Sequence, residues 1–259
     1  FTNNVSVNGT LNKFTYLASF GNRYADGLSA SKSENPEKDP FSRYNTNVKL
    51  GYEFSDNFEI TAYAGYDKFK TDIDGFPAPA YAFSDTDDEY ISQQKRVGVS
   101  PKFTYENGSF QVNAAYTKID RETISEFGSV NEADSYVIDA FNKYIFDESF
   151  YTIVGLNYGD YNSLFTTEES FTNTDPYLNV VYVSDFGLNL NAGGRLNNHS
   201  EYGSHLVYSL NPSYDIAVNE GYAKAFGSYA TSFIAPNLSQ LFGFFGANPD
   251  LKPEENQTI

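Results

Sequence analysis

The sequence predicts an all-β protein, an antiparallel up-and-down transmembrane β-barrel of which roughly a dozen strands are present. Three observations predict this fold class. Apolar and polar residues alternate over long stretches, short turns and long polar loops connect those stretches alternately, and aromatic residues gather at their ends. The composition agrees, because 22 Tyr and 23 Phe bring the aromatic fraction to 17% while Cys, Met and Trp are absent. Such a chain is rich in strand formers and poor in the residues of helical cores.

The alternation of period two is clearest in residues 44–54. Tyr44, Val48 and Leu50 fall on one face of an extended chain, and Lys49 falls on the other. The same alternation recurs in residues 58–66, 97–105, 110–116, 188–196 and 206–216. These stretches are about 10 residues long or longer, as a tilted strand needs to cross a bilayer. Only alternate residues of such a strand face lipid, so a mean hydropathy of -0.48 fits a membrane protein. The lack of an apolar run of about 18 residues excludes a transmembrane helix.

The connections between these stretches alternate in length. Short turns are expected at residues 8–9, 55–57, 107–108, 147–148, 184–187 and 219–221, all with hairpin chemistry. Long polar loops are expected near residues 22–41, 67–90, 119–135, 160–175 and 197–205. Outer-membrane barrels carry turns at one end and loops at the other in this way. The last recognisable strand, about residues 221–233, leads into a loop that ends the chain without a closing strand, so we expect an incomplete barrel.

Aromatic residues at the ends of the stretches, such as Phe20 and Phe54, suit the girdles that barrels place at the level of lipid headgroups. The alternative is packing inside the core of an aromatic-rich sandwich. Polar residues on the opposite faces of the same strands favour the girdle.

The net charge of -17 argues against nucleic acid as a partner, because phosphate binding needs clustered Lys and Arg. Acidic residues concentrate between Asp72 and Glu89, and oxygen-rich clusters of that kind favour hard cations such as calcium. The alternative is a solvated acidic loop. The two histidines, His199 and His205, lie near one expected loop, and no Gly-x-Ser-x-Gly elbow or spaced His/Cys set accompanies them. We therefore expect no enzyme activity.

Two linked stretches carry a family resemblance. The stretches are residues 231–241, with Ala235-Pro236-Asn237-Leu238, and residues 248–254, Asn-Pro-Asp-Leu-Lys-Pro-Glu. Both are similar to a mid-barrel extracellular loop of the TonB-dependent receptor family. The resemblance implies a bacterial cell outer membrane protein with a plug domain, a barrel of about 22 strands and a TonB complex as partner. Residues 1–259 would then form one partial barrel domain that lacks the plug and the last strands, with outer-membrane lipid and lipopolysaccharide around it.

Within that family the sequence most resembles the vitamin B12 transporters, chiefly through residues 235–246. Those transporters hold calcium in two adjacent extracellular loops, which the resemblance transfers to the following carboxylates: Asp26, Glu37 and Asp39 in the first loop, and Asp74 and Asp85, eleven residues apart, in the second. Gly75 falls where the family touches cobalamin. Two positions depart from the family's pattern, because Ile73 replaces a tyrosine and Asn35 replaces a glutamine.

Loop aromatics are the remaining candidates for ligand contact, because flat rings pack well on a large ring such as a corrin. They are Phe76, Tyr81, Phe83, Phe242, Phe244 and Phe245. Packing of the loops on themselves is the alternative explanation. Three functions follow: import of cobalamin, import of another ligand such as a ferric siderophore, or a non-transport surface adhesin. A surface lipoprotein that caps the loops is a further candidate partner.

Overall fold

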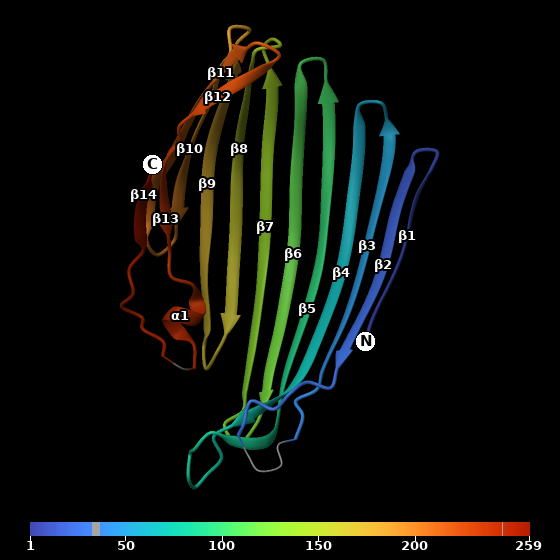
Figure 1. The fold of residues 1–259 in the computed structure, drawn as a ribbon, viewed down its shortest axis with the longest axis vertical. Coiled ribbons are helices and arrows are strands. Elements are labelled where there is room, and N and C mark those ends of the chain that lie inside the picture. Colours follow the sequence, from blue (N-terminus) through green and yellow to red (C-terminus); the bar gives the residue numbers. More distant parts are fainter. Residues whose placement is uncertain (33–36, 245) are drawn as a thin grey trace.

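The computed structural model describes residues 1–32, 37–244 and 246–259 of the chain. It is one antiparallel sheet of 14 strands with one short helix (Figure 1). The elements are β1 Thr2–Leu11, β2 Phe14–Ala25, β3 Phe41–Ser55, β4 Phe58–Gly75, β5 Ser84–Tyr105, β6 Gly108–Ile124, β7 Ser129–Ile145, β8 Phe150–Leu164, β9 Glu168–Val183, β10 Leu188–His199, β11 Gly203–Val218, β12 Gly221–Phe226, β13 Tyr229–Ile234, α1 Leu238–Phe242 and β14 Glu254–Thr258. No helix of the described residues is long and apolar enough to cross a membrane.

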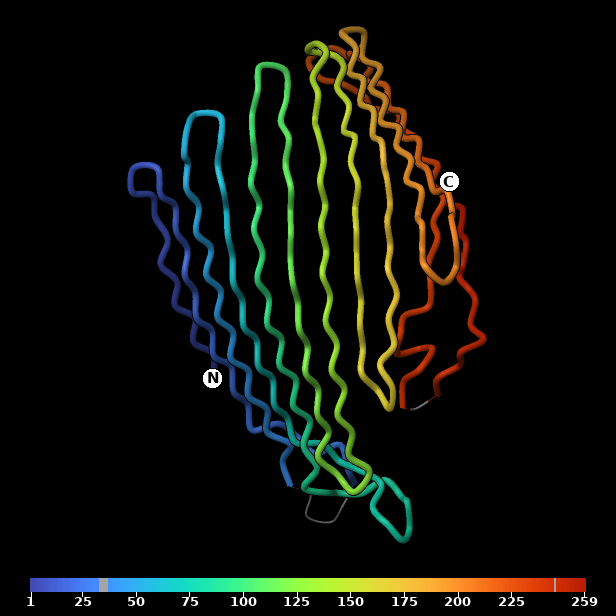
Figure 2. The backbone as a smooth tube through the Cα atoms, turned by 180° about the vertical axis from the view of Figure 1, so that it is seen from behind, coloured from blue at the N-terminus to red at the C-terminus, as the bar shows by residue number. Residues whose placement is uncertain are grey.

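The strands follow one another in up-and-down order. Each strand from β1 to β11 pairs with its neighbour in the sequence, and β13 and β14 continue the sheet. β12 also pairs with β11, beyond the point where β13 leaves it. Figure 2 shows the resulting wall, with the two ends of the chain at its opposite edges. Within the described residues β1 and β14 are not paired with each other, so the wall is a partial, unclosed barrel. The predicted fold class is confirmed.

The apolar side chains of the wall point outward instead of into a core. In β11 every second residue is exposed, including Leu206, Leu210 and Ile216, while Ser209 and Asn211 between them are half-buried on the opposite face. Leu238 and Leu241 of α1 are the only buried hydrophobic side chains among the described residues. An apolar outside and a polar inside is the distribution of a barrel in lipid. We call these two sides the lipid face and the inner face.

Aromatic rings edge the lipid face at the end that carries the short turns. Tyr52 and Phe54 lie 4.8 Å apart, centroid to centroid, and Phe146 and Phe150 lie 4.9 Å apart. Closer to the loops a second row crosses the sheet, in which the rings of Tyr116 and Tyr136 are 4.6 Å apart. Such rows suit the two interfaces of a bilayer, where an amphipathic ring lies at headgroup level.

The lipid face becomes charged immediately beyond the second row. Lys95 is opposite Lys118 in the register, and the Lys118 ammonium lies 2.8 Å from a carboxylate oxygen of Glu132. Charged pairs of this kind are stable in water and costly in hydrocarbon. The strand segments between this level and the loops therefore stand outside the bilayer.

Several predicted connections are wrong in position. Asn8 and Gly9 lie inside β1, which turns instead at Asn12 and Lys13. Most of the predicted long loops belong to strands, since β4 runs to Gly75 and β5 begins at Ser84. Beyond the membrane both faces of a strand meet water, so the apolar alternation ends while the strand continues. The predicted last strand is two strands, β12 and β13, and β14 follows the predicted terminal loop.

Candidate functional site

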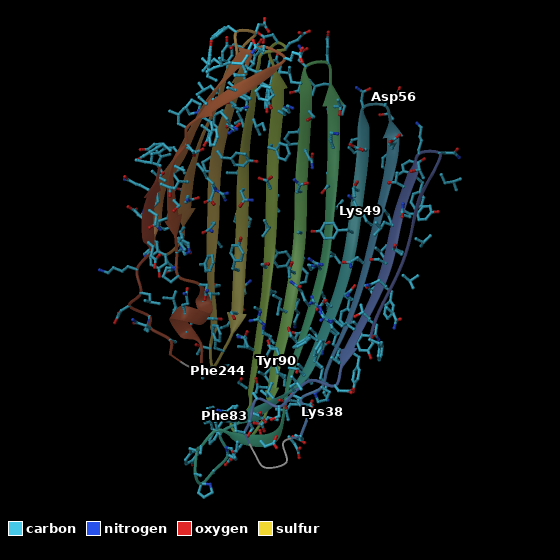
Figure 3. The ribbon with its side chains drawn as sticks, in the orientation of Figure 1. Lys38, Lys49, Asp56, Phe83, Tyr90 and Phe244 are labelled. Atoms are coloured by element: carbon cyan, nitrogen blue, oxygen red, sulfur yellow. The ribbon has the colours of Figure 1, made fainter. Side chains whose placement is uncertain are left out.

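Three connections come together at the loop end of the sheet (Figures 1 and 3). We call them loop 1, residues 26–40 between β2 and β3; loop 2, residues 76–83 between β4 and β5; and loop 3, residues 125–128 between β6 and β7. Residues 33–36 of loop 1 are outside the described residues. Five of the carboxylates predicted to bind calcium lie in loop 1 or at the adjacent ends of β4 and β5.

Carboxylates at the strand ends hold loop 1 in place. The Asp74 Oδ2 atom accepts hydrogen bonds from the Ser31 amide at 2.7 Å and the Ser29 hydroxyl at 3.2 Å. Asp85 Oδ2 accepts one from the Glu37 amide at 3.1 Å. These contacts bring the predicted residues of the first and second loops together, although they are separated by more than 40 positions in the sequence.

Two carboxylate oxygens of this group are buried without a hydrogen-bond partner among the described residues: Oδ1 of Asp39 and Oδ1 of Asp74. Asp39 uses its other oxygen to accept the Ala30 amide at 3.2 Å. Burial, followed by the charges of Asp74 and Asp85, raises the pKa of Asp39 above the ordinary aspartate value. A buried carboxylate without a partner costs free energy, and a nearby hard cation would remove that cost.

The described side chains do not by themselves form a completed metal site, since no three His, Cys, Asp or Glu of the described part converge on one point. Asp26 lies apart, because its exposed carboxylate pairs with the Lys38 ammonium at 3.6 Å. Glu37 meets the group through its backbone amide, and its side chain is exposed. Asp39, Asp74 and Asp85 are thus the three predicted ligands whose carboxylates face loop 1 and one another.

The aromatic residues of loop 2 form two ring pairs. Phe76 packs on Phe83 with centroids 5.4 Å apart, and Tyr81 packs on Phe127 of loop 3 with centroids 5.9 Å apart. Phe76, Tyr81 and Phe127, together with Gly75, line a cavity of about 430 Å³. The sequence analysis missed Phe127, although an aromatic residue followed by glycine at a loop tip was an available signal.

The other predicted ligand aromatics lie on a different segment, between β13 and β14. Phe242 ends α1, and Phe244 meets the ring of Phe165 edge-on at 6.1 Å. Figure 3 shows Phe244 and Phe83 both at the loop end, on separate elements. Phe245 is outside the described residues. The structure therefore does not bring the two aromatic groups to one cavity.

The helix α1 lies within the first of the two motif stretches. Asn237 caps it, because the Asn237 Oδ1 accepts the Gln240 amide and the Gln240 Oε1 accepts the Asn237 amide, both at 2.9 Å. Leu238 and Leu241 turn their side chains inward, and the helix packs against β9. A second cavity, of about 440 Å³, separates the start of α1 from the inner face near Tyr161 and Phe171.

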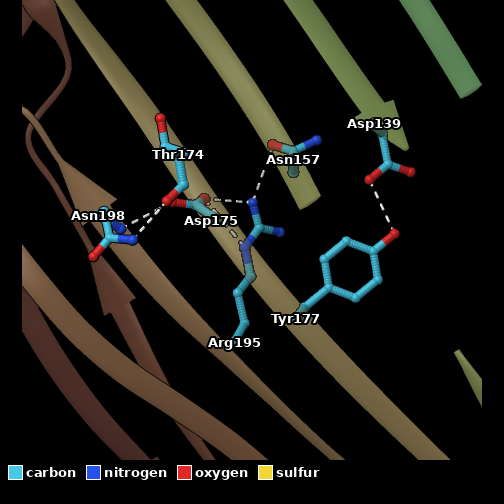
Figure 4. Close-up of polar contacts among 7 residues, drawn as sticks. All are labelled: Asp139, Asn157, Thr174, Asp175, Tyr177, Arg195 and Asn198. Atoms are coloured by element: carbon cyan, nitrogen blue, oxygen red, sulfur yellow. Dashed lines mark hydrogen bonds and ion pairs between the residues drawn. The ribbon is translucent and has the colours of Figure 1, made fainter. Parts of the chain in front are cut away.

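Farther along the inner face a polar network joins β8, β9 and β10 (Figure 4). The Asp175 side chain is 2% exposed, and its Oδ2 lies 2.6 Å from Arg195 Nη2. Arg195 also donates to Asn157 at 3.2 Å, and the Asn198 amide donates to the other Asp175 oxygen at 3.0 Å. Each group of the pair is hydrogen-bonded, which a buried charge requires. The network fixes the spacing and register of these strands from the inside.

The comparison with protein families now decides the assignment. The family described as TonB dependent receptor-like, beta-barrel matches residues 1–259. The chain belongs to this family. Its members are transport receptors of the bacterial outer membrane and not enzymes, so the predicted location is confirmed.

Three solved structures share the fold. The siderophore receptor PirA from Acinetobacter baumannii matches with a TM-score of 0.77 at 13% identity, covering 92% of this chain and 41% of PirA. PirA from Pseudomonas aeruginosa matches at 0.75 and 16%, with coverages of 92% and 40%. A variant of the ferric enterobactin receptor PfeA from Pseudomonas aeruginosa matches at 0.76 and 13%, with coverages of 93% and 42%. The chain thus spans about two fifths of these receptors' length, and at such identities the likeness establishes the fold alone.

Proposed function

We propose that this chain is the loop-bearing wall of a TonB-dependent importer, which captures a large ligand at the cell surface through loops ordered by calcium. The observation that carries the proposal is the meeting of Asp39, Asp74 and Asp85 beneath loop 1, with buried oxygens of Asp39 and Asp74 that have no hydrogen-bond partner among the described residues. Coupling to TonB through a plug domain is part of the proposal, because the chain spans about two fifths of the related receptors' length.

Calcium suits this group of oxygens better than a transition metal. It takes about 6–8 oxygen ligands in flexible geometry, which carboxylates, backbone carbonyls and water can supply. Asp39, Asp74 and Asp85 would hold the ion, and its charge would relieve the repulsion that raises the pKa of Asp39. Because the same carboxylates anchor loop 1 through backbone amides, a bound ion would stiffen loop 1 against β4 and β5.

A ferric siderophore is the first ligand to test, because the similar solved structures include siderophore receptors. Cobalamin is the second candidate. It rests on the resemblance of residues 235–246 to vitamin B12 transporters and on Gly75, which borders the aromatic cavity beside Asp74. Membership of a transport-receptor family argues against the adhesin hypothesis. A lipoprotein over the loops stays a prediction.

The test titrates the full-length receptor in detergent, first with calcium and then with ferrichrome, ferric enterobactin and cyanocobalamin, each in calcium or in chelator. We expect at least one ligand to bind, with an affinity that chelation lowers. Asp74→Asn is expected to weaken calcium binding by about tenfold or more, since it removes one charged ligand. Asp26→Asn is the matched control, because Asp26 pairs with Lys38 away from the group. Equal calcium affinity in the two variants would contradict the proposed site.

A further inference from the structure

The cavity between loop 2 and loop 3 has walls suited to one kind of chemical group. Its apolar lining comes from Ile73, Phe76, Pro77, Tyr81 and Phe127. The three aromatic rings remain more than half exposed, at 57%, 60% and 53%, although they border a cavity. Exposed aromatic surface gathered at the tips of loops indicates a binding surface, because a water-soluble loop gains nothing by displaying it.

The two loops are held together across the cavity. The Ala78 amide of loop 2 donates a hydrogen bond of 2.8 Å to Glu126 Oε2 of loop 3, and the ring of Tyr81 rests on that of Phe127. Residues nearly 50 positions apart in the sequence therefore build one concave surface. A group that enters it would contact both loops at once.

The charge around the cavity is entirely negative. The ionisable groups in the lining are Asp74, Asp88, Glu126 and the Tyr81 phenol, and no Lys or Arg of the described chain lines it. Neither Asp88 nor Glu126 forms an ion pair with a described Lys or Arg, so their charges are not neutralised locally. Like charges repel over several ångströms even at a surface. A polyanionic group would therefore be disfavoured here.

We propose that this cavity receives a flat or apolar group of an imported ligand whose overall charge is zero or positive. The inference rests on the proposed function, and it narrows the ligand class. Hydroxamates bind ferric iron as monoanions and give neutral or cationic complexes, whereas catecholates bind it as dianions and give polyanions. Tyr81 and Phe127 would pack on the flat surface, and a cationic group would also gain from the aromatic faces and from Glu126. A ferric hydroxamate or a neutral corrinoid fits, and a ferric tris-catecholate does not.

The test compares the affinities of the full-length receptor for ferrichrome, cyanocobalamin and ferric enterobactin. Phe127→Ala is expected to weaken binding of the preferred neutral complex by about tenfold, the loss of one aromatic contact. Phe146→Ala, at the opposite end of the sheet, is its control and should leave affinity unchanged. Glu126→Gln keeps an acceptor for the Ala78 amide but removes the charge. It should strengthen binding of ferric enterobactin by a few-fold and leave the neutral complexes unaffected, whereas the control Glu106→Gln should do neither.

The outcomes separate this inference from the proposed function. Tightest binding of a neutral complex, weakened by Phe127→Ala, supports both. Tightest binding of ferric enterobactin, indifferent to Phe127→Ala and Glu126→Gln, overturns the inference while the importer remains. Failure of all three complexes to bind would overturn both together.

Discussion

Loop 1 depends on a single glycine. Gly27 has a φ of +67°, and a Cβ added there would collide with the Asp39 carbonyl. Gly27 therefore lets the chain pass directly over the residue that carries a buried carboxylate. The approach has no room for a side chain, and the backbone conformation itself suits glycine.

We expect Gly27→Ala to displace Asp39 and to weaken calcium binding by about tenfold or more, measured by calorimetric titration of the full-length receptor. Gly203→Ala is the matched control, since Gly203 also has positive φ, +76°, but an added Cβ there would meet nothing within 4 Å. A loss of calcium affinity in Gly203→Ala as large as that in Gly27→Ala would show that the collision with Asp39 is not the cause.

Arg195 is the second residue with a measurable role, in stability. Its removal would leave the Asp175 carboxylate, 2% exposed, without its cation. We expect Arg195→Ala to lower the free energy of unfolding by about 2–4 kcal/mol, seen as a lower temperature at which the unboiled receptor loses its compact migration on a gel. Arg195→Lys should lose less, because it keeps the charge and gives up the planar fork. Unchanged stability of Arg195→Ala would refute the structural role of the pair.

Single residues were predictable where their chemistry was visible in the sequence. The convergence of Asp39, Asp74 and Asp85 followed from the family resemblance, and the structure brings them together. The contribution of Phe127 was not predictable, because it depends on how loops 2 and 3 fold against each other. No local pattern encodes such a contact between distant loops.

At the scale of elements, the two faces of each strand carry different constraints. In β5 the Val99 side chain is on the lipid face, 40% exposed, between the two aromatic rows, and Ser100 is on the inner face. A charge on the lipid face near the bilayer midplane costs about 2–4 kcal/mol, and one in a polar interior costs little.

We therefore expect Val99→Arg to destabilise the full-length receptor by about 2–4 kcal/mol and Ser100→Arg to leave it nearly unchanged, in urea unfolding from lipid vesicles. The reverse order would show that the two faces are assigned the wrong way round. The pair differs by one position in the sequence, so local strand propensity is the same for both.

Strands were predictable wherever lipid imposes an apolar face and unpredictable beyond it. Residues 97–105 and 206–216 alternate because one side must be apolar, and β5 and β11 contain them. Residues 84–90 are equally extended in β5 but stand in water, where polar residues on both faces imitate a loop. The helix α1 is too short for its periodicity to appear in the sequence.

At the scale of the whole molecule, the described wall has two open edges, β1 and β14. Backbone groups at an edge in hydrocarbon cost several kcal/mol each when unpaired, so further strands must cover both. We expect residues 1–259 alone, refolded into detergent, to give no band that shifts on boiling, whereas the full-length receptor gives one. A heat-modifiable band from this chain alone would show that its edges pair with each other or with a second copy.

Because the side chains that face lipid are spread over alternate positions, the newly made chain carries no continuous greasy segment. It can cross aqueous compartments without being arrested in the first membrane it meets, which a chain with apolar helices could not do. Its apolar surface exists only after the strands have paired and their faces have separated. Pairing of the strands is therefore also the event that turns a water-compatible polymer into an object that only a bilayer can accommodate.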